Sequence, residues 1–265
     1  MPFFNGILSP MDQKEMMRYA GLPKLKEFPE EEILDTIREM TAIAEPRGVW
    51  EIFSYDPLQQ KIMSPSPLAL KGRSIRRHLE DCLTVAIMAV TVGEEAERQI
   101  SEYFADGHYT RGLLLDAAAT AAVEHLADQM NRYIEKKVTG KGQVCTWRFS
   151  PGYGDWPVTQ QASLCSLLGT EKIDVNVTAY SMLTPRKSVT AVIGISDCPV
   201  RRRPKDCGAC TLQSCAFRRT AGNGAKNKEE VYKEVVSICI YLTVPWEPCC
   251  RNMASLQESA RSCSV

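Results

Sequence analysis

An arginine and a tyrosine flank a tight turn in residues 148–157, which read Arg-Phe-Ser-Pro-Gly-Tyr-Gly-Asp-Trp-Pro. Arg148 offers a planar fork of N–H donors that matches the geometry of a carboxylate. Pro151 and Gly152 favour a sharp turn that brings backbone close to a ligand. Tyr153 presents an aromatic face suited to a cation such as a sulfonium, or to the edge of a macrocycle. These residue types predict a small-ligand site.

A purely structural role also fits these residues. An arginine followed five residues later by a tyrosine can mark a plain strand–turn–helix corner in which Arg148 forms a salt bridge. Glu124 and Asp116 lie on a long predicted helix, where acids usually face solvent or pair with arginine. Asp116 interrupts an apolar stretch, so a buried carboxylate there needs a hydrogen-bonding partner. We interpret Asp116 as structural and leave both roles open for Glu124.

A second group of residues with metal-binding chemistry lies near the C-terminal end, at Cys198, Cys207, Cys210 and Cys215. A Cys-x2-Cys pair can place two thiolates on one metal, and four soft ligands suit zinc or an iron–sulfur cluster. The other two gaps match no standard zinc-finger spacing. The alternative is a set of reduced thiols in a flexible basic segment.

Composition excludes several classes of function. Lys plus Arg and Asp plus Glu are balanced at 32 each, so no overall field attracts nucleic acid or an anionic membrane. Residues 1–10 lack a charged leader, and the longest apolar-rich run, residues 83–92, is about half of a bilayer-spanning helix. The three histidines form no Ser/His/Asp pattern. We expect a cytoplasmic protein that binds neither nucleic acid nor membrane and is no self-contained hydrolase.

The elements that must position these side chains follow from hydrophobic periodicity and from Pro and Gly punctuation. Helices are predicted over residues 31–45, 94–105, 110–138 and 157–168. Strands are predicted over residues 50–55, 82–92, 144–149, 173–178 and 189–195. Small residues at 117–122 let another backbone approach closely, which favours a central, buried position for helix 110–138. The turn at 148–157 then joins a strand to a helix, where ligand sites commonly form.

The composition changes beyond residue 196 and divides the chain into three parts. Residues 1–196 predict an α+β domain, residues 197–219 form a basic cysteine-rich appendage, and residues 220–265 are a linker and a tail. The tail contains one helical or strand-like run at residues 231–244.

The string at 148–157 resembles the S-adenosylmethionine-binding reactivation domain of cobalamin-dependent methionine synthase, particularly its free-standing bacterial form. Four further segments agree in order, at residues 12–21, 78–82, 115–124 and 185–193. The similarity covers about residues 12–219. It implies a twisted antiparallel sheet with flanking helices, one long central helix and a cysteine-rich C-terminal appendage.

The resemblance implies an accessory role in methyl transfer. The cobalamin of such a methionine synthase is occasionally oxidised to the inactive cob(II) state, and its uphill reduction is coupled to methylation by S-adenosylmethionine. A flavodoxin-type protein usually supplies the electron. A chain of this length lacks the other modules of the enzyme, so the corrinoid methionine synthase, or a related methyltransferase, is expected to be a separate partner.

The resemblance also implies roles for individual residues. Arg148 would bind the carboxylate of S-adenosylmethionine at the turn formed by Pro151 and Gly152. Tyr153 would lie between the ligand and the corrin. Glu124 matches a family acid near the ligand's amino group, where an anion complements an ammonium.

Two positions depart from the family pattern or extend it. An aromatic pair that contacts the ligand in long methionine synthases is replaced by Ile193 and Gly194, so a contact there would be apolar or through the backbone. Free-standing relatives often carry a similar cysteine-rich motif that ends in an aromatic-arginine pair, as at residues 217–218. The appendage would hold a metal or relay an electron.

Three hypotheses follow. The first is an accessory reactivation subunit of methionine synthase. The second is a non-catalytic corrinoid-binding or electron-relay module that kept the fold and lost S-adenosylmethionine. The third, a general S-adenosylmethionine methyltransferase, is disfavoured because no Gly-rich loop follows a first strand.

Overall fold

A computed structural model describes residues 2–8, 11–21, 29–139 and 142–197 of the chain. A seven-stranded antiparallel sheet runs through this part, with strand order β4-β3-β2-β5-β9-β6 and with β1 paired to β2. Its strands are β1 Phe3–Phe4, β2 Arg47–Asp56, β3 Lys61–Met63, β4 Leu68–Ala69, β5 Thr84–Thr91, β6 Val144–Cys145 and β9 Ser188–Ser196. A small second sheet pairs β7 Asn176–Val177 with β8 Leu183–Thr184.

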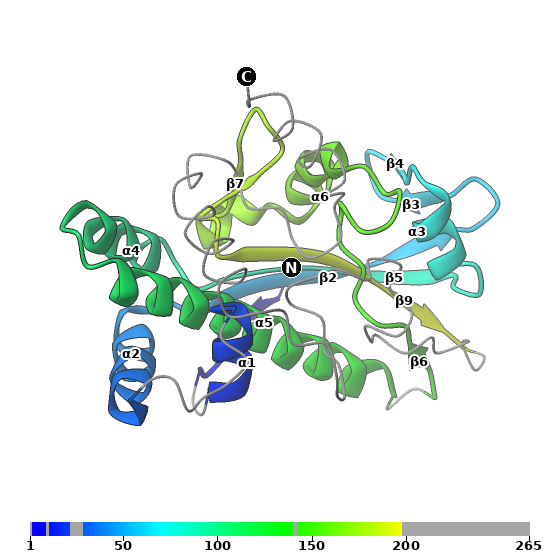
Figure 1. Cartoon of the computed structure of the whole chain (residues 1–265). Coiled ribbons are helices and arrows are strands. Elements are labelled where there is room, and N and C mark those ends of the chain that lie inside the picture. The colour runs from blue at the N-terminus through cyan, green and yellow to red at the C-terminus, as the bar shows by residue number, and fades with distance from the viewer. Residues whose placement is uncertain (1, 9–10, 22–28, 140–141, 198–265) are drawn as a thin grey trace, which may run out of the picture.

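Helices cover both faces of the main sheet (Figure 1). The long helix α5, with α1, α2 and α4, packs against one face, and α3 and α6 pack against the other. The α-helices are α1 Gln13–Tyr19, α2 Glu30–Ile43, α3 Arg73–His78, α4 Glu95–Ala105, α5 Tyr109–Thr139 and α6 Gln161–Leu168. Within the described residues, no helix is both long and apolar enough to cross a membrane.

The central strands β5 and β9 separate two hydrophobic cores. Alternate side chains of a strand point to opposite faces, so a strand covered on both sides is apolar almost throughout. On one face Ala86, Met88 and Ile193 pack with α5 in what we call the α5-side core. On the other face Val85, Ile87 and Val192 pack with α3 and α6 in what we call the α6-side core.

The long helix α5 occupies the central position that its small residues predict. Ala118, Ala119 and Ala122 are fully buried in the α5-side core. Because alanine adds little bulk, α1, α2, α4 and the strands β5 and β9 all contact this helix. The expected antiparallel sheet, flanking helices and single long helix are therefore confirmed.

Local differences from the sequence expectations lie around the turn and the second sheet. The strand expected at 144–149 shortens to β6 and a single bridge between Phe149 and Val192. The strand expected at 173–178 was wrong for most of its length, because a 3-10 helix covers Thr170–Ile173 and only Asn176–Val177 pairs. The helix expected at 157–168 begins as a 3-10 turn, Val158–Gln160. The parts at 198–219 and 220–265, with the run at 231–244, lie outside the described residues.

Candidate functional site

The chain after β6 runs along the edge of β9 and turns Arg148 toward α5. The amide of Phe149 donates to the carbonyl of Val192 at 2.9 Å, and the amide of Val192 donates back at 2.8 Å. Trp147 and Phe149 pack with the α6-side core. Because neighbouring side chains of an extended segment alternate, Arg148 points to the opposite face, where α5 lies.

Arg148 is buried and paired with two carboxylates of α5. Its side chain is only 5% exposed, and it donates through Nη2 to Glu124 and through Nη1 to Asp128. These acids are one helical turn apart, which places them on one face of α5. Burial by itself would lower the pKa of Arg148, but Glu124 and Asp128 outweigh it and raise the pKa. The guanidinium therefore stays charged.

The turn at Pro151 and Gly152 is closed by its own backbone. Gly152 adopts a φ of 94°, a conformation that glycine reaches without strain, and its amide donates to the carbonyl of Trp156 at 2.8 Å. The amide of Trp156 donates to Tyr153 at 3.0 Å. Pro151 and Gly152 are both buried. The predicted turn is thus a closed loop that presents Tyr153.

Tyr153 extends an aromatic cluster on the face opposite α5. Its half-buried ring lies 5.6 Å from the ring of Phe149 and 6.4 Å from that of Trp147, between centroids. Its phenol is near enough to Arg148 to contribute to the raised pKa of that residue. The guanidinium and the aromatic ring are thus neighbours along the chain that face opposite sides of the sheet.

His78, at the end of α3, holds the backbone that precedes Arg148. Its Nε2 lies 2.8 Å from the carbonyl oxygen of Trp147, which can only accept, so Nε2 carries the hydrogen. Its ring also lies 4.8 Å from Trp147 and 4.9 Å from Phe149. Burial lowers the pKa of His78 to about 4, although the bond to Trp147 opposes the shift. The sequence offered no spacing that connects His78 to this loop, 69 residues away.

Asp155, from the same loop, attaches it to the start of α3. Its carboxylate accepts the backbone N–H of Ser74 at 2.7 Å and of Arg73 at 3.0 Å. These bonds hold the pKa of Asp155 well below its usual range. The loop is therefore fixed to α3 at both ends of that helix.

Ile193 and Gly194 are buried in the sheet. Ile193 packs in the α5-side core. A Cβ at Gly194 would lie 2.5 Å from Sγ of Cys82 and 2.9 Å from Cδ2 of Leu79, so no larger side chain fits there without rearrangement. Their contact with a ligand stays a prediction, as do the ligand contacts of Arg148, Pro151, Gly152, Tyr153 and Glu124.

Asp116 has the partner that a half-buried acid in an apolar stretch requires. Nζ of Lys187 lies 2.8 Å from its carboxylate and 2.9 Å from Oγ1 of Thr120. Lys187 is only 7% exposed, so the pair joins the start of β9 to α5 inside the fold. This geometry agrees with a structural role for Asp116.

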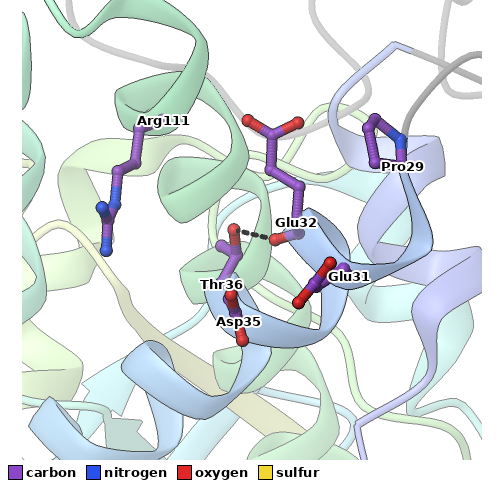
Figure 2. Close-up of a pocket in the computed structure, with 6 residues that line it drawn as sticks. All are labelled: Pro29, Glu31, Glu32, Asp35, Thr36 and Arg111. Atoms are coloured by element: carbon purple, nitrogen blue, oxygen red, sulfur yellow. Dashed lines mark hydrogen bonds between the residues drawn. The ribbon is translucent and has the colours of Figure 1, made fainter.

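No candidate metal site lies in the described part of the chain. Cys198, Cys207, Cys210 and Cys215 fall outside it, and the described His, Cys, Asp and Glu residues form no group that could hold a metal ion. Figure 2 shows a surface hollow of about 310 Å³ lined by Glu31, Glu32 and Asp35 of α2, with Arg111 of α5. None of the predicted ligand residues lines this hollow.

Comparison with known proteins gives a structural likeness only. No protein-family model matches the sequence, and no curated protein matches it. A crystal structure of the MetH reactivation domain bound to AdoHcy matches with a TM-score of 0.54 and 13% sequence identity, over 73% of this chain and 77% of that one. At this identity the likeness concerns the fold. The chain therefore has the fold of the MetH reactivation domain.

Proposed function

We propose that this chain is an accessory subunit for the reductive reactivation of a cobalamin-dependent methionine synthase or related corrinoid methyltransferase. In this role it acts in the cytoplasm, in methionine biosynthesis, and positions S-adenosylmethionine against the cobalamin of its partner. The observation that carries the proposal is the meeting of Arg148 and Glu124 beside the Tyr153 loop. AdoHcy, which the structural neighbour binds, is an analogue of S-adenosylmethionine.

The side chains present suit the amino-acid end of such a ligand. The guanidinium of Arg148 matches its carboxylate, and the partly exposed carboxylate of Glu124 matches its ammonium. Tyr153, from the loop that follows Arg148, offers an aromatic ring for the sulfonium. The site therefore carries one group for each charge of the ligand.

The partner's cobalamin would take up one electron from a flavodoxin-type or other donor and the methyl group of S-adenosylmethionine, which would leave as S-adenosylhomocysteine. This chain's residues bind and orient the ligand, so that methyl transfer between two molecules becomes a step within one complex. Burial of Arg148 among protein atoms keeps its charge away from bulk water and strengthens its contacts. The methyltransferase activity would thus belong to the complex of this chain with its corrinoid partner.

A metal on Cys198, Cys207, Cys210 and Cys215 is a further part of the proposal. The residue types and the Cys-x2-Cys spacing support an iron–sulfur cluster or zinc. Such a site would either brace the appendage or relay the electron toward the corrinoid partner.

Direct titration with S-adenosylmethionine by calorimetry tests the binding site. We expect Arg148→Ala to weaken binding by about tenfold or more, because it removes a charge-assisted pair. Arg111→Ala is the matched control, since Arg111 also lies on the α5 side and pairs with an acid, Glu39, away from the loop. Equal affinities of wild type and Arg148→Ala would contradict the carboxylate contact.

Arg148→Ala also leaves two carboxylates without their cation, so its fold must be checked. Arg148→Lys keeps the charge and loses the fork, and we expect it to recover only part of the affinity. Circular dichroism of all three variants separates loss of binding from loss of structure.

A second function is favoured by two observations. Arg148 already has Glu124 and Asp128 as partners, and β9, which contains Ile193 and Gly194, carries no aromatic side chain. A non-catalytic corrinoid-binding or electron-relay module would have these features. Partner binding without any binding of S-adenosylmethionine would favour it, whereas methylation of cob(II)alamin on the partner under reducing conditions would exclude it.

A further inference from the structure

One end of the main sheet exposes apolar side chains on the face that α5 covers elsewhere. Side chains alternate along β2, so Ile52 lies on the same side as Trp50, which packs in the α5-side core. Met63 of β3 is paired with Ser54 and therefore points to this side as well. Ile52 is 37% exposed and Met63 is 45% exposed, so the described residues leave this part of the face open. We call Ile52, Ser54 and Met63 the open corner.

The open corner lies in the row of the sheet where the described chain ends. Met63 pairs with Ser54, which pairs on its other side with Thr84 of β5. Thr84 pairs in turn with Ile195 of β9, and β9 ends one residue later at Ser196. Neighbouring strands are about 4.8 Å apart, so roughly 14 Å separate β3 from β9 along this row. Figure 1 shows β3 and the end of β9 at the same end of the sheet, away from α2 and α4.

The chain that continues from this point contains an apolar run at residues 231–244, which read Val-Tyr-Lys-Glu-Val-Val-Ser-Ile-Cys-Ile-Tyr-Leu-Thr-Val. Most of these side chains are apolar, so removing them from water is favourable. As a helix the run would be about 21 Å long, and as a strand longer still, so either form can cross the row from β9 to β3. Residues 198–230 join the run to β9 and are more than long enough to let it turn back onto the sheet.

We propose that residues 231–244 pack on the open corner and cover Ile52 and Met63. This segment is the occupant, in place of a second copy or a partner protein, because it is tethered beside the corner and the tether keeps its local concentration high. The cysteine-rich residues 198–219 would then lie in a loop that is held at both ends at this end of the sheet. The packing does not depend on the binding of S-adenosylmethionine.

Hydrogen exchange of the full-length protein, read by mass spectrometry, tests this packing. In the wild type we expect the amides of residues 231–244 to exchange at least about tenfold more slowly than those of an unstructured chain. Ile52→Ser combined with Met63→Ser should remove most of this protection, because the run loses the apolar side chains on which it packs. Peptides from the buried strand β5 show in the same experiment whether the sheet of the variant is intact.

Tyr109→Ser is the matched control, because Tyr109 is a large side chain that is 64% exposed at the start of α5, away from the open corner, and its loss should change nothing. Val236→Ser combined with Ile240→Ser alters only the run and should speed exchange at residues 61–69. Rapid exchange of residues 231–244 in the wild type overturns the proposal and leaves the open corner to a partner protein. Slow exchange that survives the paired serine replacements in the sheet also overturns it. Protection that appears only as the protein concentration rises would place the run on a second copy, and contradicts it as well.

Discussion

His78 shows how one side chain can define the backbone of a candidate site. Its Nε2–H bonds to Trp147, the residue before Arg148, and its ring lies close to two aromatic rings. A neutral imidazole suits this position, since a charged ring would have to be desolvated. The protonation state of His78, which orients the backbone before Arg148, therefore depends on pH.

We expect the free energy of unfolding to fall as pH decreases from the ordinary pKa of histidine, 6.5, toward about 4. The pKa of His78 is depressed in the folded state, so only the unfolded chain takes up the proton in this window. The His78 contribution between about pH 7 and about pH 5 should be roughly 2 kcal/mol. Urea unfolding at both pH values measures it.

His78→Phe keeps an aromatic ring and removes the titration. Between the same two pH values, the free energy of unfolding of this variant should change by roughly 2 kcal/mol less than that of wild type. The missing hydrogen bond lowers the stability equally at both pH values and does not affect this comparison. His108→Phe, at an exposed position, should keep the wild-type slope. The same slope in wild type and His78→Phe would show that His78 does not titrate as described.

At the scale of elements, the short helix α3 is tied to the candidate site at each end. Asp155 accepts the N–H groups of its first residues, and His78 at its last turn bonds to Trp147. Six residues are too few for a stable isolated helix. The position of α3 therefore depends on the loop, and the loop on α3.

Asp155→Ala should destabilise the protein by about 1 kcal/mol, the usual loss for an N-terminal helix cap. We expect a lower thermal midpoint, and weaker binding of S-adenosylmethionine than the change in stability alone explains, because the Tyr153 loop loses its anchor. Asp155→Asn has a single carbonyl oxygen, so it can accept one of the two N–H groups and should retain only part of the stability. Differential scanning calorimetry of the two variants makes the comparison.

Much of the architecture could be predicted from periodicity. The continuous apolar run in β5 and the small residues of α5 each indicate their burial, and the structure agrees; the alternation in β9 predicts one buried face, and the structure buries both. The run at 173–178 alternates in the same way, but Gly169 begins a 3-10 turn and the buried Ile173 and Val175 pack beside α6 instead of in a long strand. Local pattern alone does not distinguish these cases.

The sequence predicted which residues form the candidate site, but not which of them pair with one another. Arg148 and Glu124 were both selected, but their direct pairing spans 24 residues and depends on the path of the chain along β9. Asp128 could have been found, since an acid four residues after Glu124 must share its face of the helix. The bond between Asp116 and Lys187, 71 residues apart, required the fold.

At the scale of the whole molecule, the metal site proposed for the cysteine-rich segment is supported by the sequence alone. Anaerobically purified full-length protein should contain about one equivalent of zinc or one iron–sulfur cluster, because four thiolates complete either site. Elemental analysis and the visible absorption spectrum distinguish the two. Less than about a tenth of an equivalent of both metals would rule the metal out.

A double variant provides the control for metal content. Replacing Cys207 and Cys210 with serine should abolish metal binding, because it removes the close pair of ligands. Replacing Cys249 and Cys250 with serine changes another close pair outside the proposed set and should leave the metal content unchanged.

The alternation along residues 147–149 has an optical consequence. Arg148 faces the acids of α5 while the half-exposed indole of Trp147, one residue earlier, lies among His78, Phe149 and Tyr153. We expect a rearrangement of the guanidinium toward a ligand to change the surroundings of this fluorophore, which is one peptide unit away on the other side of the segment. Tryptophan emission should therefore change as S-adenosylmethionine is titrated into the wild type, and Trp147→Phe should lose that change while the other three tryptophans remain.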